Sequence, residues 1–202
     1  MGQFLFMRKY RSPILLYLLL ISLVFVLKIF LDSGTVFSIS AALMLLIPFL
    51  ANTEYNYFDF NISGFLKGVL ISLVVLAAYL VVLFAYGFIS GKQPDIREAG
   101  YSFFFIQLFL VAIPEEVFFR GYLQKKFGND YRAVVVVSIL FAVAHLVIVC
   151  ATTGSLGVCV QNGLTFFPSL VMGYLFLKTG TLWSSIFFHF TANILHILIK
   201  FG

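Results

Sequence analysis

Seven apolar stretches dominate this sequence, and each is close to the ~20 residues that a helix needs to cross a bilayer. Hydrophobic residues make up 62% of the chain and charged residues only 10%, whereas about a quarter of the residues in a soluble domain are charged. The sequence therefore predicts an all-α fold, a polytopic integral membrane bundle of about seven transmembrane helices, with six to eight compatible with the pattern. The stretches cover residues 13–31, 35–51, 65–89, 100–125, 131–151, 162–178 and 181–200.

No polar tract or Pro/Ser-rich linker divides the 202 residues, so we expect one membrane domain, residues 1–202. The first stretch is too long for the core of a signal peptide and no small-residue cleavage site follows it, so we expect it to stay as an anchor. Basic residues collect on the cytoplasmic side, and with seven spans both basic clusters fall on the side of the N-terminus. These clusters are Arg8, Lys9 and Arg11, and Lys125, Lys126 and Arg132.

We interpret the net charge of +5 as a signal for the orientation of the chain in the membrane, and not as a sign of nucleic-acid binding. The loop between the second and third stretches fits less well, because it carries Glu54 and Asp59. No basic stripe with interleaved aromatic residues lies outside the apolar stretches, so no nucleic-acid partner is expected.

Two glutamates and an arginine interrupt the fourth stretch, in the segment AIPEEVFFRGYL. An ionised side chain in the middle of a bilayer costs roughly a few to more than ten kcal/mol, so such residues usually face a cavity, pair with each other and serve a function. Glu116 and Arg120 are four residues apart and can form an ion pair on one helix face. Glu115 is turned by about 100° from Glu116 and lacks such a partner. Pro114 removes a backbone hydrogen bond just before the glutamates, which opens room beside them.

A structural ion pair would explain Glu116 and Arg120 but not Glu115, and the histidines offer a further partner. His145 lies in the fifth stretch, and His189 and Asn193 share one face of the seventh. With a rise of 1.5 Å per residue, Glu115 and these three residues lie roughly 12–20 Å from the cytoplasmic ends of their helices, near mid-bilayer. We expect His196, further along the same face, at the membrane interface and outside the site.

These residue types suit hydrolysis by an activated water. A carboxylate and an imidazole beside one water can take its proton and pass it to the leaving amine. A second imidazole and an amide can donate hydrogen bonds to the oxyanion of a tetrahedral intermediate. Two less favoured assignments stay open. Glu115, His145 and His189 could bind zinc, and a buried carboxylate with histidines could relay protons in a transporter.

Three motifs follow one another on separate apolar stretches: Glu115-Glu116-x-x-x-Arg120, Phe141-x-x-x-His145 and His189-x-x-x-Asn193. They resemble the motifs of the CPBP family, also called Abi, over roughly residues 100–200. This family contains CAAX prenyl endopeptidases and bacteriocin-processing or immunity proteins, and the resemblance implies an all-helical intramembrane endopeptidase. By the family's pattern, Glu115 and His145 activate the water, His189 and Asn193 form the oxyanion site, and Glu116 and Arg120 support the first glutamate.

The resemblance also implies a membrane-anchored peptide or protein as substrate. No His-Glu-x-x-His helix is present and Glu/His/Asn sets also work without a metal, so we expect no cofactor and do not favour a metal. The segment FFPSLVMGYLFLKTGTLWSSIFFH resembles small bacterial members thought to process C-terminal sorting signals. We therefore expect a protein of a bacterial cytoplasmic membrane and place a prenylated substrate second. A non-catalytic immunity protein that sequesters a peptide is the alternative function, and the oligomeric state stays open.

Two smaller features concern structure. Cys150 and Cys159 flank the loop after the fifth stretch, on the outer side in this topology, where a disulfide and two free thiols are both compatible with the sequence. Gly64 and Gly68 have the spacing of a helix-packing motif, which carries little weight alone because small residues are common in membrane helices.

Overall fold

The computed structural model describes residues 2–51, 56, 58–153 and 155–201, with the backbone alone for residues 2–11 and 151–153. Glu54, weighed above for the orientation, lies outside these residues. The first three helices are α1 (Gly2–Phe30), α2 (Ser33–Ala51) and α3 (Ile62–Ser90). The last four are α7 (Tyr131–Thr153), α8 (Leu156–Gly163), α9 (Phe166–Thr179) and α10 (Leu182–Leu198).

Between α3 and α7 lies one continuous helix of 27 residues, Tyr101–Phe127, which we call the rod. Pro114 does not end this rod, although it has no N–H to donate; instead the backbone takes the wider π-helical pattern on both sides of it. The parts of the rod are α4 (Tyr101–Ile106), the π-helix η1 (Gln107–Ala112), α5 (Ile113–Glu116), the π-helix η2 (Val117–Gln124) and α6 (Lys125–Phe127).

The helices confirm the predicted polytopic membrane bundle. Within the described part of the chain, six helical segments are long and apolar enough to cross a membrane, counting α8 and α9 together as Leu156–Thr179, and α10 is a shorter apolar helix. Two boundaries were predicted wrongly. Residues 199 and 200, expected at the end of the last span, belong to strand β2 (Ile199–Phe201), and helix α8 begins at Leu156, in a segment expected as a loop.

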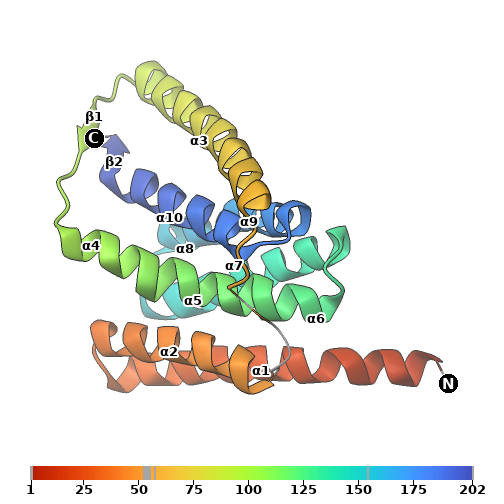
Figure 1. The fold of residues 1–202 in the computed structure, drawn as a ribbon. Coiled ribbons are helices and arrows are strands. Elements are labelled where there is room, and N and C mark those ends of the chain that lie inside the picture. The colour runs from red at the N-terminus through yellow and green to blue at the C-terminus, as the bar shows by residue number, and fades with distance from the viewer. Residues whose placement is uncertain (1, 52–55, 57, 154, 202) are drawn as a thin grey trace.

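The rod lies at the centre of the bundle (Figure 1). Helices α1 and α2 lie side by side, and α2 packs against η1, α5 and η2. Helices α9 and α10 pack against the rod as well, and α7 contacts α9, η2 and α1. All residues of η2, Val117–Gln124, are buried. The rod is therefore enclosed by helices from both halves of the chain.

Helix α3 packs on α10 and α9, while its far end diverges from α4 (Figure 1). Gly64 and Gly68 lie in this contact: a Cβ atom at Gly68 would overlap Ser184 of α10, and one at Gly64 would overlap the backbone oxygen of Thr179. Because neither residue has a Cβ, α3 approaches its neighbours closely. The glycine spacing thus marks a real helix contact.

The far end of α3 is connected to α10 by a two-stranded antiparallel sheet of β1 (Pro94–Ile96) and β2. Asp95 pairs with Lys200 in this register, which places opposite charges across the strands. The ring of Phe201 lies against Gly87 of α3 at a place where a Cβ would overlap it. The sheet and this ring contact tie the end of α10 to α3.

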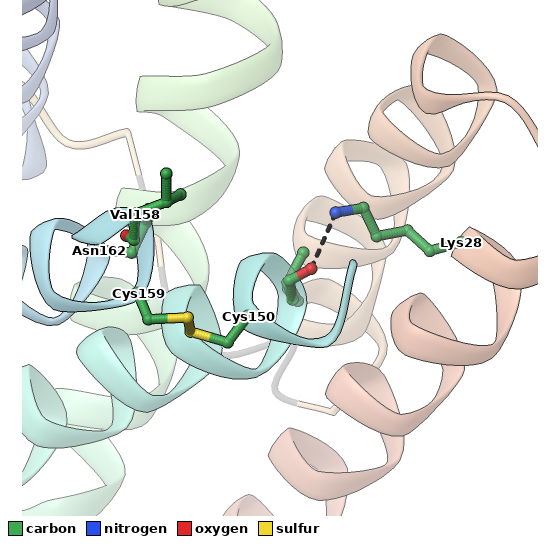
Figure 2. Close-up of a disulfide and its surroundings, with 6 residues drawn as sticks. Lys28, Cys150, Val158, Cys159 and Asn162 are labelled. Carbon is green, nitrogen blue, oxygen red and sulfur yellow. Dashed lines mark hydrogen bonds between the residues drawn. A yellow bond between two sulfur atoms is a disulfide. The ribbon is translucent and has the colours of Figure 1, made fainter. Parts of the chain in front are cut away.

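A disulfide between Cys150 and Cys159 joins the end of α7 to α8 (Figure 2). Near it, Lys28 at the end of α1 donates a hydrogen bond of 2.8 Å from Nζ to the carbonyl oxygen of Ile148. The ends of α1 and α7 and helix α8 therefore lie at one side of the bundle. Of the two options that the sequence left open for the cysteines, the structure has the disulfide.

Candidate active site

A cavity of about 80 Å³ lies where the rod, α7, α9 and α10 meet, a volume that suffices for water. Four of the six predicted site residues line it: Glu115 of α5, His145 of α7, and His189 and Asn193 of α10. Helices that are distant in the sequence thus bring their polar groups to one place. The remaining lining is mainly apolar and consists of Val111, Phe141, Thr165, Pro168, Met172, Phe188 and Ala192.

The imidazole of His189 lies between the two consecutive glutamates. Its Nδ1 is 2.9 Å from Glu116 Oε1 and its Nε2 is 3.7 Å from Glu115 Oε2. Glu116 is fully buried, whereas the side chain of Glu115 is 14% exposed and borders the cavity. The 100° turn between adjacent helix positions lets one carboxylate hold the ring from behind while the other lines the cavity.

Arg120 completes the buried charge cluster. Its Nε is 3.4 Å from Glu116 Oε2, and both side chains are 0% exposed. Its Nη2 donates to the backbone oxygen of Ser169 at 3.1 Å and to Ser169 Oγ at 2.9 Å, and its Cζ lies 5.0 Å from the centre of the Phe141 ring. The predicted ion pair is present, and the contacts just given link it to His189 and to α9.

Ser169 was not predicted as a partner of Arg120. Ser169 and Gly173 are four residues apart on α9 and lie against the rod, where Gln124 Nε2 donates to the carbonyl oxygen of Gly173 at 3.0 Å. Small residues at this spacing in an apolar helix could have indicated a helix contact. They could not have indicated which polar side chain would donate hydrogen bonds to them.

Two contacts between His145 and Phe141 account for the four-residue spacing of the second motif. Its Nδ1 is 3.0 Å from the carbonyl oxygen of Phe141, one turn earlier. A carbonyl only accepts, so Nδ1 is the donor, and in the neutral ring Nε2 is then the nitrogen with the lone pair. The ring of His145 also lies 4.4 Å from that of Phe141, which in turn is 6.1 Å from His189. Phe141 therefore orients one histidine and contacts the other.

Asn193 donates from Nδ2 to Oε1 of Gln107 in η1 at 3.2 Å. Gln107 is a second residue that the sequence did not single out. Its signal was an amide in the apolar fourth stretch, eight residues before Glu115. Nothing in that stretch indicated that its partner would be Asn193.

His196 lies outside the lining of the cavity, as expected. Its Nδ1 is 3.2 Å from the hydroxyl of Tyr79 in α3, and its Nε2 is 3.3 Å from Gln161 Nε2 in α8. These contacts connect three helices near the end of α10. His196 is therefore a helix-bridging residue in this structure.

The zinc arrangement considered from the sequence would need Glu115, His145 and His189 gathered around one point. Across the residues that the structure describes, no group of three or more His, Cys, Asp or Glu side chains has an arrangement that could hold a metal ion. The polar groups that line the cavity are two imidazoles, one carboxylate, one amide and the hydroxyl of Thr165.

A sequence model described as "Rce1-like: Type II CAAX prenyl endopeptidase Rce1-like" matches residues 98–195. The matched segment contains all six predicted site residues together with the rod, α7, α8, α9 and most of α10. No curated protein and no solved structure matches the chain. The family match agrees with the motif resemblance and implies a protease embedded in a lipid bilayer. Residues 98–195 are thus similar to the Rce1-like family of type II CAAX prenyl endopeptidases, in agreement with the CPBP group that the three motifs resemble.

Proposed function

We propose that this protein is an intramembrane glutamate endopeptidase, which hydrolyses a peptide bond of a membrane-associated protein or peptide. One observation carries the proposal: Glu115, His145, His189 and Asn193, from three helices, line one small cavity inside an apolar bundle. Scattered structural pairs would have no reason to converge in this way. The family match supports hydrolysis as the chemistry.

Glu115 and His145 activate the water in this proposal. Glu115 Oε2 is buried and has no hydrogen-bond partner among the described residues, so it can accept a proton from a water in the cavity. In the neutral ring of His145, Nε2 has the lone pair because Nδ1 donates to the backbone. The water oxygen attacks the scissile carbonyl carbon while its proton passes to Glu115, and the same proton later goes to the leaving amine as the C–N bond breaks.

His189 and Asn193 stabilise the oxyanion of the tetrahedral intermediate. Glu116 occupies Nδ1 of His189, which leaves Nε2 for the cavity. Nε2 donates to an oxyanion when the ring carries both protons, and the carboxylate of Glu116 lies where it would balance that positive charge. Asn193 contributes an amide N–H beside it. Donors that are fixed in place in a dry site are each worth about 10²–10³ in rate.

Glu116 and Arg120 support these groups from behind the cavity. Arg120 pairs with Glu116, and Glu116 fixes the ring of His189. Arg120 is itself held by Ser169 and the face of Phe141. The substrate we propose is a membrane-anchored peptide, with C-terminal sorting-signal or CAAX-like processing as the form of cleavage. The mechanism needs no cofactor.

The first test compares the wild type with Glu115→Gln in cells by mass spectrometry of membrane-peptide termini. We expect termini that appear with the wild type only, because loss of a general base lowers the rate by about 10²–10⁴. Glu98→Gln makes the same chemical change at an exposed position before α4 and should cleave like the wild type. Purified protein assayed with a chelator should stay active.

Identical termini from wild type and Glu115→Gln, together with an equal cellular phenotype, would contradict a catalytic role. The fold would then act by binding a peptide, as an immunity protein does. Loss of cleavage with the chelator would contradict the metal-free form of the mechanism.

A further inference from the structure

We propose that Gln107 is a positioning residue that holds the amide of Asn193 in the orientation required to bind the oxyanion. The inference rests on the proposed function, since it assigns Asn193 the role of a donor. It adds a residue outside the three motifs and places part of the site on the π-helix η1. The observation behind it is the hydrogen bond from Asn193 Nδ2 to Gln107 Oε1 at 3.2 Å.

The direction of this hydrogen bond matters because an asparagine amide has a donor end and an acceptor end of nearly the same shape. Donation to an oxyanion requires the NH₂ group to face the cavity, whereas a flipped amide would present its oxygen and repel the developing charge. Gln107 Oε1 accepts one of the two Nδ2 protons, and the other stays available to the cavity that Asn193 lines.

The π-helical turn explains how Gln107 reaches this position. In a regular α-helix, residues eight apart differ in direction by about 80°, because each step of four overshoots a full turn by about 40°. Gln107, Val111 and Glu115 follow one another at steps of four, and η1 lies between Gln107 and Glu115. The wider turn of the π-helix reduces this difference in direction between residues eight apart. Val111 and Glu115 line the cavity, and Gln107 contacts a third lining residue from the same rod.

The experiment measures kcat and KM of purified variants on an internally quenched peptide that spans the cleavage site found in the cellular comparison. Gln107→Met keeps the length of the side chain and removes the acceptor, so kcat should fall about tenfold, the effect of one hydrogen bond, with KM little changed. Gln107→Glu keeps an acceptor and should retain more activity than Gln107→Met. Thermal unfolding of each variant accompanies the kinetics.

A double-mutant cycle separates positioning from a general structural role. In an Asn193→Ala background, Gln107→Met should cause no further loss of kcat, since there is no amide left to orient. Gln161→Met is the matched control, because Gln161 also lies in a membrane helix and contacts a polar side chain, His196, away from the cavity. It should leave kcat unchanged.

Equal losses in Gln107→Met and Gln107→Glu, or additive losses in the double variant, would overturn the positioning role while leaving the proposed function intact. Wild-type kcat in Gln107→Met would do the same. Full activity of Asn193→Ala would instead contradict the oxyanion assignment, and the absence of any wild-type-specific cleavage site would contradict the proposed function itself.

Discussion

Glu116 and Arg120 are buried charges that depend on one another. Removing one partner of such a pair leaves the other charged and unpaired, which typically costs 3–5 kcal/mol. We therefore expect Arg120→Met to lower the free energy of unfolding in detergent micelles by about 3–5 kcal/mol. The double variant Glu116→Gln/Arg120→Met has no buried charge left and should recover most of this stability.

Peptide cleavage should not recover together with the free energy of unfolding in the double variant Glu116→Gln/Arg120→Met. The double variant lacks the carboxylate that fixes His189 Nδ1, so its cleavage rate should stay low although its fold is restored. A double variant as unstable as Arg120→Met would show that the pair is not what makes the single change costly. Chemical unfolding and peptide cleavage measured on the same preparations separate the two effects.

Single residues also show where prediction from the sequence succeeds. Charged and histidine side chains stand out in apolar helices because burying them is expensive, and helix spacing placed Glu115, His145, His189 and Asn193 at one depth. Gln107 and Ser169 did not stand out, because an amide or a hydroxyl is common in membrane helices. Their importance comes from partners on other helices, and one sequence carries no information on such pairs.

At the level of helices, the contact between α3 and α10 depends on Gly68. A side chain at this position would overlap Ser184, so the helices would have to separate. We expect Gly68→Leu to destabilise the fold by about 1–3 kcal/mol, the usual cost of overpacking, and to lower activity because α10 carries His189. Thermal unfolding in detergent measures the first effect.

Gly157 of α8 provides the control, since nothing lies within 4 Å of a Cβ placed there. Gly157→Ala should be neutral or slightly stabilising, because alanine favours a helix more than glycine does. If Gly68→Leu were as stable as the wild type, the packing of α3 on α10 would not depend on a close approach of the two helices at Gly68.

The sequence predicted which stretches form helices, but it did not predict the π-helical segments or the short strands. Long apolar stretches must form helices in a bilayer, because only internal hydrogen bonds satisfy their backbone. Pro114 indicated a disturbance of the fourth helix, yet not the π-helical pattern on both sides of it. The strands β1 and β2 have three residues each and lie far apart in the sequence, so their pairing depends on where α3 and α10 place them.

The molecule as a whole has two chemically different sides. The disulfide and Lys28 lie at one side, and disulfides persist in oxidising compartments. The basic residues Lys125 and Lys126 at the end of the rod and Arg132 at the start of α7 lie at the opposite end of α7 from the disulfide. We therefore propose that the N-terminus is cytoplasmic and the disulfide extracytoplasmic.

Labelling of thiols in intact cells tests this orientation. After treatment with a membrane-impermeant reductant, an impermeant maleimide should label Cys150 and Cys159. In a Cys150→Ser/Cys159→Ser background, Tyr131→Cys places a thiol at the exposed start of α7 and should react only after the cells are opened. The reverse pattern would mean that the protein is inserted the other way round.

Helix α10 has 17 residues, so it is about 25 Å long, which is less than the ~30 Å hydrocarbon core of a typical bilayer. A span that is too short is accommodated by local thinning of the bilayer. Because His189 and Asn193 belong to α10, lipid headgroups and the water among them come closer to the cavity than in an undisturbed membrane. In the function that we propose, the acyl-chain length of the surrounding lipids therefore affects how easily water and a peptide substrate reach the cavity.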